Sequence, residues 1–422
     1  MCQWHMFSTD RSGAETWECV ARSNPQAQIL QAMKGMKTLR SGRNRRKWIY
    51  VLLLMGLLGL SGCGSPSSAS VEMSSQTELV KTGSMELQYA ENFAVDYYED
   101  GYKMLTTLPD SKRYLLVPEG QPVPRGLDED VSILQEPLQN IYLVASGAMD
   151  MFASLDAVDQ IRFSGQKQEN WYIQTAKDAM AAGDMIYAGK YSKPDYELLV
   201  SEGCDLAIEN RMITHSPEVV EMLQSFDIPV MIEYSSYEQH PLGKVEWVKF
   251  FGALTGKEAE AEEAFVEQTE ILEKVESGEK TGKTIAFFYV TSNGLIQVRQ
   301  SMDYIPKLIE LAGGRYIFED LEDSGSGRST LNMQVEDFYA GGKDADILIY
   351  NSSIDGGVTT LDELIGKCNI LKDFKAVQEG QVYCTTNDMY QQSMAIGYLL
   401  QDMHMVLTDD DTAKLRYLFL LQ

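Results

Sequence analysis

Short apolar runs alternate with amphipathic stretches in two long segments of the chain, residues 141–240 and 284–407. A short apolar run fits a buried strand, and an amphipathic stretch fits a helix with one buried face. Strand followed by helix, repeated, is typical of a parallel sheet covered by helices. We therefore expect an α/β protein with two Rossmann-like lobes and mostly parallel sheets. The predicted strands are 141–145, 206–208 and 229–232 in the first segment, and 284–297, 347–350 and 381–383 in the second.

The two segments also resemble each other. Asp205-Leu-Ala-Ile-Glu-Asn210 in the first matches Asp346-Ile-Leu-Ile-Tyr-Asn351 in the second, and Glu197 and Glu336 lie upstream of these runs. Because order, spacing and the terminal asparagine agree, an internal repeat with two similar lobes is favoured over a chance similarity between generic α/β runs.

Two further segments frame the lobes. Alternation in Met85–Ala90 and Arg113–Val117 predicts an opening hairpin region. Residues 257–275 contain no proline and combine apolar with charged positions, so they predict one long helix. About 20 helical residues extend roughly 30 Å, enough to bridge two lobes. The expected boundaries are 85–243 for the amino-terminal lobe, 244–277 for a single connecting helix and 278–422 for the carboxy-terminal lobe.

The amino-terminal region has the pattern of an export signal. A basic cluster ends at Lys47, and the apolar stretch 48–60 that follows is shorter than the roughly 18 to 20 residues of a spanning helix. Leu60-Ser61-Gly62-Cys63 then resembles the lipobox of bacterial lipoproteins, which implies that the Cys63 thiol is lipidated. An ordinary signal peptide with an accidental cysteine is the alternative. We expect residues 1–62 to be an upstream region and signal peptide, 63–84 a flexible tether, and the protein to be anchored on the extracytoplasmic face of the cell membrane.

Charge and composition narrow the function classes. The net charge is −26, and it becomes −32 without residues 1–62, which hold nine Lys or Arg and three Asp or Glu. Such a charge disfavours nucleic acid and anionic lipid surfaces as partners. The remaining histidines are far apart in sequence, and the remaining cysteines lack CxxC spacing, so a bare metal site and a zinc site are disfavoured and no resident cofactor is expected. These residues are His215, His240, His404, Cys204, Cys368 and Cys384. Cys368 and Cys384 could form a disulfide, but two buried thiols are the favoured alternative.

The layout from about residue 91 to residue 407 resembles the solute-binding proteins of ABC importers, in the class that serves iron–siderophore, haem and cobalamin uptake. The resemblance is carried by three motifs: Lys193-Pro-Asp-Tyr-Glu-Leu-Leu199, Leu308-Ile-Glu-Leu-Ala-Gly-Gly314 and Asp373-Phe-Lys-Ala-Val-Gln-Glu-Gly-Gln-Val382. It implies capture of a ferric chelate or tetrapyrrole, without chemistry on it, and delivery to a permease and its ATPase. We expect the chain to act as a monomer, although the sequence does not establish whether it acts alone.

Ligands of open α/β sheets bind beyond the carboxyl ends of the strands. The residues that follow the predicted strands there include Ser146, Tyr234 to Tyr237 and Asn351. Tyrosine faces and arginine forks suit planar, anionic chelates. Our ligand candidates are Tyr187, Lys190, Tyr191, Arg211, Arg299 and Tyr390, although lobe packing explains a tyrosine and pairing with a carboxylate explains an arginine equally well.

Three carboxylates are candidates for docking to the permease. In the resembled class, a glutamate at the outer rim of each lobe contacts arginines of the permease. Glu197 matches by motif, while Asp303 and Glu336 occupy the repeat positions of the second lobe. A surface carboxylate with no role is the alternative for each.

Other function classes remain open. An exported enzyme would need chemistry, yet the sequence contains no Gly-x-Ser-x-Gly, no His-Glu-x-x-His and no P-loop, so no catalytic residues are assigned. A surface-binding module on the same fold, and a protein that binds a bare metal ion, are the further alternatives.

Overall fold

The computed structural model describes residues 4–9, 15–19, 79–321, 329–352, 357–410 and 412–422. The chain divides into two units, residues 1–75 and 76–422. In the first, β1 (Trp4–Thr9) and β2 (Glu15–Cys19) form an antiparallel pair. The predicted signal, Cys63 and most of the tether lie outside the described residues. No described strand of residues 76–422 pairs with β1 or β2, and the hydrophobic core consists of described residues from this second unit alone. We therefore expect residues 76–422 to fold without the first unit.

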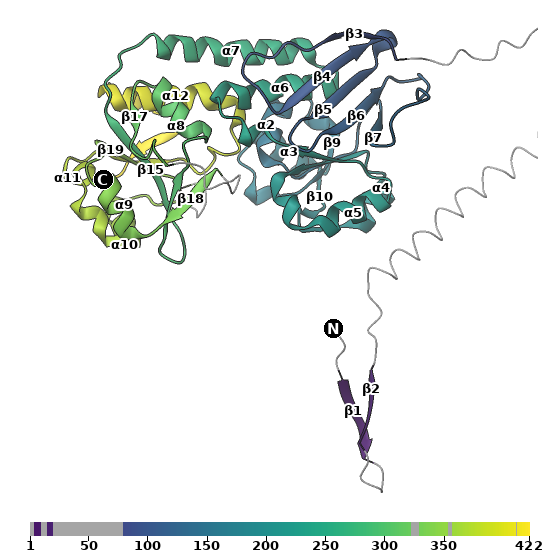
Figure 1. Ribbon diagram of the computed structural model, residues 1–422, viewed down its shortest axis with the longest axis horizontal. Coiled ribbons are helices and arrows are strands. Elements are labelled where there is room, and N and C mark those ends of the chain that lie inside the picture. Colours follow the sequence, from purple (N-terminus) through teal and green to yellow (C-terminus); the bar gives the residue numbers. More distant parts are fainter. Residues whose placement is uncertain (1–3, 10–14, 20–78, 322–328, 353–356, 411) are drawn as a thin grey trace, which may run out of the picture. The chain divides into compact units, whose positions relative to one another are not determined.

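The amino-terminal lobe is built on a five-stranded parallel sheet with the order β10-β9-β8-β13-β14. The predicted apolar runs form three of its strands, two central and one at an edge, and helices connect the strands as expected (Figure 1). The strands are β8 (Ile141–Leu143), β9 (Ile161–Ser164), β10 (Ile186–Tyr187), β13 (Leu206–Asn210) and β14 (Val230–Glu233). The helices are α2 (Ser146–Ser154), α3 (Gln174–Ala182), α4 (Tyr196–Glu202) and α5 (Pro217–Ser225), and a small hairpin joins β11 (Gly189–Lys190) to β12 (Lys193–Pro194).

The carboxy-terminal lobe has a parallel centre and antiparallel edges. Its order is β18-β16-β15-β19-β20-β21, with β17 also paired to β15. The predicted single strand 284–297 is wrong in one respect, because the chain reverses and forms an antiparallel hairpin of β15 and β16. The strands are β15 (Thr284–Val290), β16 (Ile296–Arg299), β17 (Arg315–Tyr316), β18 (Thr330–Met333), β19 (Ile347–Tyr350), β20 (Val382–Thr385) and β21 (Leu418–Leu420). The helices are α8 (Tyr304–Leu311), α9 (Val335–Gly342), α10 (Leu361–Lys367), α11 (Lys375–Gln378) and α12 (Ile396–Thr408).

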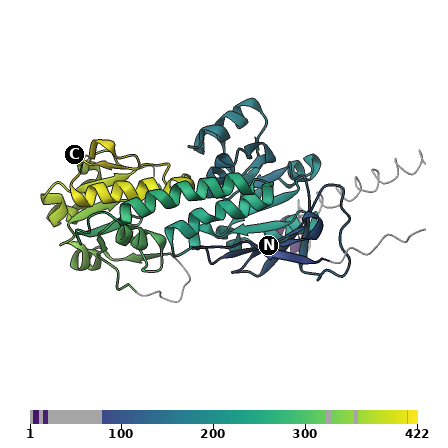
Figure 2. The ribbon, with the colours of Figure 1, turned by 90° about the horizontal axis from the view of Figure 1, so that it is seen from above.

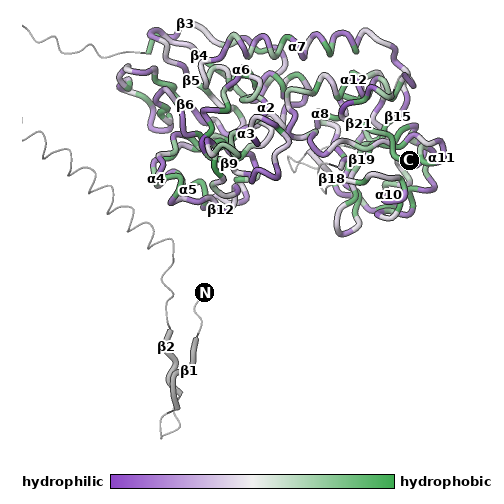
Figure 3. The backbone as a smooth tube through the Cα atoms, turned by 180° about the vertical axis from the view of Figure 1, so that it is seen from behind, coloured by the Kyte–Doolittle hydropathy of each residue, from purple (hydrophilic) through white to green (hydrophobic). Residues whose placement is uncertain are grey.

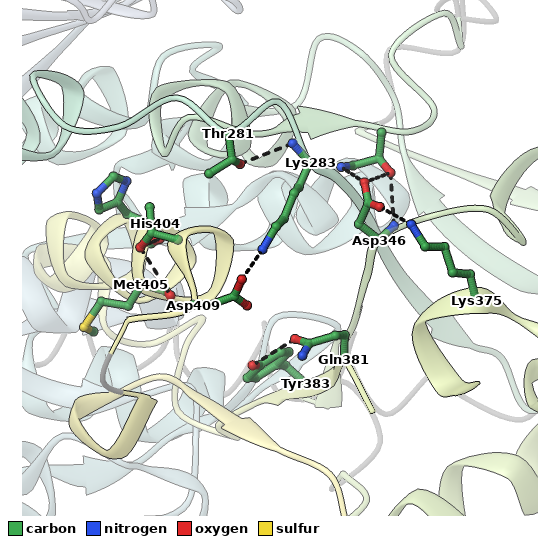
Figure 4. Close-up of polar contacts among 11 residues, drawn as sticks. Thr281, Lys283, Asp346, Lys375, Gln381, Tyr383, His404, Met405 and Asp409 are labelled. Atoms are coloured by element: carbon green, nitrogen blue, oxygen red, sulfur yellow. Dashed lines mark hydrogen bonds and ion pairs between the residues drawn. The ribbon is translucent and has the colours of Figure 1, made fainter. Parts of the chain in front are cut away.

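The internal repeat has a physical basis at the amino ends of the two sheets. Asp205, just before β13, accepts hydrogen bonds from the backbone N–H groups of Gln139 and Asn140, just before β8. Asp346, just before β19, accepts one from the backbone N–H of Thr284 (2.7 Å), the first residue of β15, and also pairs with Lys375 (Figure 4). In both lobes the matched aspartate therefore ties the starts of two neighbouring parallel strands.

A separate sheet precedes the amino-terminal lobe. It consists of β3 (Lys81–Ser84), β4 (Phe93–Tyr98), β5 (Lys103–Thr107), β6 (Lys112–Val117) and β7 (Val131–Gln135), antiparallel except for the β6–β7 pair. The predicted strand at Met85–Ala90 does not form. The backbone N–H groups of Gln88, Tyr89 and Ala90 donate instead to the buried carboxylate of Glu246, at 2.8 to 3.1 Å.

The connection between the lobes consists of two helices, so the single connecting helix expected over 244–277 is wrong, although the long helix predicted over 257–275 is confirmed as the second of the two. In α6 (Pro241–Thr255), every residue from Pro241 to Leu254 is buried. Gly256 then adopts a left-handed conformation, and α7 (Glu258–Glu276) runs beside α6 (Figure 2).

Helix α7 contacts both the amino-terminal sheet and the carboxy-terminal lobe. Near its start, Glu258 pairs with Lys103 of β5, and farther along Gln268 accepts a hydrogen bond from the backbone N–H of Gly397 in α12. Hydrophobic and hydrophilic positions alternate along α7, as expected for a helix with one buried face (Figure 3). Among the described helices, none combines the length and the apolar character needed to cross a bilayer.

Candidate functional site: an inter-lobe cleft

Two cavities lie where the carboxyl ends of the sheets face each other. The first, of about 440 Å³, is lined by residues that follow β13, β14 and β16, and we call it the tyrosine cavity after Tyr234 and Tyr237. The second, of about 290 Å³, lies beside the start of α2, and we call it the Gln391 cavity. Both fall at the position where open α/β sheets bind ligands.

A buried polar cluster from the carboxy-terminal lobe faces this cleft. Arg299 donates hydrogen bonds to Asp303 (3.3 Å) and to the hydroxyl of Tyr390, and Asn351 donates to the same hydroxyl at 2.5 Å. Asn351 Oδ1 is buried and has no hydrogen-bond partner among the described residues. The cluster therefore holds Tyr390 firmly and leaves an amide oxygen as an unused acceptor.

A lysine from the helical connection adds a second cation. Lys244 of α6 lies over the ring of Tyr304 at 4.8 Å, and burial lowers its pKa while the carboxylate of Glu233 opposes that shift. Burial also raises the pKa of Tyr390, so this phenol is neutral at physiological pH. Two basic side chains, Arg299 and Lys244, thus lie close to two acidic ones, Glu233 and Asp303, in the buried region beside the cleft.

The tyrosine cavity offers aromatic faces and one cation. The guanidinium of Arg211 lies over the Tyr237 ring at 4.6 Å, and the Tyr234 and Tyr237 rings meet edge to face at 6.4 Å. Arg211 follows β13 directly, and Tyr234 follows β14, so the ends of two neighbouring strands bring these side chains together.

Direct hydrogen bonds join the lobes at the Gln391 cavity. The side chain of Gln391 accepts from the backbone N–H of Tyr172 and donates to the carbonyl of Asn170, both at 2.8 Å. Nearby, Asp150 of α2 accepts from the backbone N–H of Met394 at 2.7 Å. Burial raises the pKa of Asp150 to about 6, although this hydrogen bond opposes the shift. These contacts join the two lobes directly.

The predicted ligand residues separate into two groups. Arg211 lines the tyrosine cavity, Tyr390 lines the Gln391 cavity, and Arg299 contacts Tyr390 between them. Tyr187, Lys190 and Tyr191 line neither of these cavities, because they belong to β10 and the β11–β12 hairpin. Tyr187 is 41% exposed, and Tyr191 packs against the apolar cluster under α4 and α5.

The docking candidates also differ in their surroundings. Glu197 and Glu336 are exposed, and each is the second residue of the helix that leads into the matched strand of its lobe. Asp303 is only 4% exposed, begins α8 by accepting a hydrogen bond from the backbone N–H of Ile305, and pairs with Arg299. A carboxylate buried and bonded in this way is unavailable to a permease, so its prediction as a docking residue is corrected.

Among the described residues, no group of three or more His, Cys, Asp or Glu side chains could hold a metal ion. Cys368 and Cys384 are buried and are not joined by a disulfide, and burial raises the pKa of the Cys368 thiol.

Sequence reasoning missed several residues of the cleft. Lys244 and Gln391 gave no motif signal, since their importance depends on contacts with the opposite lobe. Asn92 and Pro109 also line the tyrosine cavity, although they belong to the amino-terminal sheet, which the repeat does not include. The position of Ser146, Arg211 and Tyr234 to Tyr237 after predicted strands pointed to the surfaces of these cavities.

Solved structures with the same arrangement are known. A possible iron-binding periplasmic solute-binding protein from Staphylococcus epidermidis matches with a TM-score of 0.50 at 17% identity, covering 64% of this chain and 98% of that one. The periplasmic haem-binding protein of Vibrio cholerae matches with 0.50 at 14% identity, covering 62% and 96%. The molybdate-binding protein of Haemophilus influenzae matches with 0.51 at 11% identity, covering 67% and 91%. The chain has the fold of the periplasmic solute-binding proteins.

The relatives found by sequence are more similar to this chain than the solved structures are, but their names do not state a function. Two uncharacterized lipoproteins of Methanocaldococcus jannaschii share 24% and 23% identity, covering 81% and 86% of this chain and 87% and 95% of theirs. No family model matches the chain. Because the solved structures are named for iron, haem and molybdate, the fold alone does not identify a ligand.

Proposed function

We propose that this protein is the lipid-anchored, extracytoplasmic binding component of an ABC importer, and that it captures an anionic metal chelate or tetrapyrrole without altering it. The observation that carries the proposal is the cleft between the strand ends of the two lobes, where Arg211 and Tyr237 line one cavity and Tyr390, held by Arg299, lines the other. Such a site recognises a small molecule through cations and aromatic faces. The fold and the lipoprotein relatives agree with it.

The remaining partners follow from this role. A permease and its ATPase would receive the ligand, with Glu197 and Glu336 as exposed docking carboxylates. Diacylated Cys63 would hold the carrier at the membrane. The carrier itself would be a monomer. Replacing Cys63 by alanine should release the protein from the membrane fraction and abolish palmitate labelling, and retention of both would contradict the anchor.

Tryptophan fluorescence provides the binding test. The indole N–H of Trp247 donates to Glu238, which lines the tyrosine cavity, and Trp171 lies between Asn170 and Tyr172, which line the Gln391 cavity. We expect residues 76–422 to show saturable quenching with one member of a panel of ferric hydroxamate, ferric catecholate, haem, cobalamin and molybdate. No quenching by any member, in protein whose circular dichroism shows that it is folded, would refute the proposal.

A matched pair of arginine variants locates the site. Arg211→Gln should weaken binding roughly tenfold or more, because a charge-assisted hydrogen bond to an anion is lost. Arg315→Gln removes the same charge at the amino end of β17, where Arg315 pairs with Glu319 on the surface, and should leave the affinity unchanged. Equal effects of the two substitutions would place the ligand elsewhere.

A further inference from the structure

The amino-terminal sheet reaches the ligand cleft. Asn92, before β4, and Pro109, in the turn between β5 and β6, line the tyrosine cavity together with Arg211 of the amino-terminal lobe and Met302 of the carboxy-terminal lobe. Three separate parts of the fold therefore enclose one cavity.

The wall contributed by this sheet is held rigidly. The backbone N–H of Asn92 donates to Glu238 (3.0 Å), and its carbonyl accepts from the backbone N–H of Leu108 (2.9 Å). In the same turn, the hydroxyl of Thr107 donates to Asp110 at 2.6 Å. Burial and the contact with Asp110 both raise the pKa of Tyr234, so its phenol stays protonated and can donate to that carboxylate. The turn between β5 and β6 is thus held by Thr107 at the end of β5, by Asn92 before β4, and by Tyr234 of the amino-terminal lobe.

The lining has a definite chemical character. Tyr237 and Met302, which face the cavity from opposite lobes, are 38% and 40% exposed, so both present apolar surface to it. The carboxylates of Glu238 and Asp303 are already engaged, by backbone N–H groups and by Arg299 respectively. The guanidinium of Arg211, stacked on Tyr237, is the cation at this wall. Aromatic faces beside a guanidinium favour an aromatic anion.

We propose that the amino-terminal sheet forms a third wall of the ligand site, and that the tyrosine cavity holds an aromatic, anionic portion of the ligand against Arg211, Tyr237 and Pro109. This inference rests on the proposed binding function and assigns part of the specificity to a sheet outside the two lobes. A cavity of about 440 Å³ has the size of a fused-ring sulfonate or carboxylate.

The test uses 8-anilinonaphthalene-1-sulfonate, an aromatic sulfonate whose emission rises in apolar surroundings, with residues 76–422 at low salt. Pro109→Glu and Pro109→Lys place opposite charges on the third wall. A unit charge about 8 Å from the sulfonate changes affinity roughly two- to threefold in water, so the glutamate variant should bind more weakly and the lysine variant more tightly than the parent. A purely structural effect would weaken both.

Matched controls come from the opposite end of β6. Gln121 lies in the exposed turn that follows this strand, and Gln121→Glu and Gln121→Lys should leave the affinity unchanged. The inference is overturned if the parent protein shows no saturable binding of the sulfonate, or if both variants at position 109 shift the affinity in the same direction or not at all. The proposed function fails separately, when the sulfonate binds and responds to position 109 but no member of the chelate panel binds.

Discussion

Glu209 makes the stability of the amino-terminal lobe depend on pH. It lies in β13, is 0% exposed, and neither carboxylate oxygen has a hydrogen-bond partner among the described residues. Burial raises its pKa from 4.5 to about 8. Between these values the folded state keeps a proton that the unfolded state has released, so the free energy of unfolding falls as the pH rises from about 4.5 to about 8.

The magnitude follows from the size of the shift. A difference of about 3.5 pKa units corresponds to at most about 5 kcal/mol, since each unit is worth roughly 1.4 kcal/mol. Glutamine resembles the protonated carboxyl and does not titrate. Glu209→Gln should therefore change stability little at pH 5 and raise it by up to about 5 kcal/mol, relative to the parent, at pH 8.

Urea unfolding of residues 76–422, followed by the fluorescence of the buried Trp171 in the same lobe, measures this difference. Glu221→Gln, an exposed change on α5, is the matched control and should give the same small difference at both pH values. If Glu209→Gln behaves like the control, within about 0.5 kcal/mol, then Glu209 ionises at an ordinary pH and the argument from burial is wrong.

Two further substitutions test contacts that hold the parts of the fold together. Gln391→Ala removes both hydrogen bonds to the opposite lobe, a loss of about 1–3 kcal/mol. The backbone amide of Tyr172 should then exchange with deuterium at least about fivefold faster. Unchanged protection of this amide would show that Gln391 does not help to join the lobes. Glu246→Ala leaves three backbone N–H groups without an acceptor and should lower the free energy of unfolding in urea by about 3–5 kcal/mol. Lys249 pairs with both Glu246 and the exposed Glu262, so Glu262→Ala is the control and should cost under about 1 kcal/mol. Equal losses would contradict the role of Glu246.

The sequence predicted those elements whose pattern is local. The runs around β8, β13 and β19 were recognisable because an apolar strand buried on both faces leaves a continuous signal. The aspartates before β13 and β19 were visible as a repeat, and their common role in tying strand starts explains the spacing.

Helix α6 shows why other elements were beyond reach. Its buried Glu246 and Lys249 look like solvent-facing positions in sequence, and their burial is acceptable only because partners from distant segments satisfy them. The alternation in Met85–Ala90 likewise reflects a segment with one buried side. Its backbone N–H groups bond to the carboxylate of Glu246 in α6 and not to a neighbouring strand, which the sequence pattern could not reveal.

The candidate site divides in the same way. Arg299 and Tyr390 were each proposed, but their contact across 91 positions of sequence was not predictable. Tyr187 and Lys190 were predicted from their chemistry and because they precede the helix that follows Pro194, but they belong to β10 and the β11–β12 hairpin and line neither cavity. Pro109 lacks any chemical signal, since its value lies only in the surface it presents.

The carboxylates that fix the amino-terminal sheet set an order for its completion during synthesis. Glu238 and Glu246 follow the amides they bind by 146 to 158 positions, so a chain made from its amino end displays β4 and β5 on the order of 10 s before these acceptors emerge. Throughout that interval the apolar face that α6 later covers, with Phe93, Val95 and Leu105, is open to water and to strands of other nascent chains. The sheet can therefore reach its final hydrogen bonding only after α6 has been synthesised.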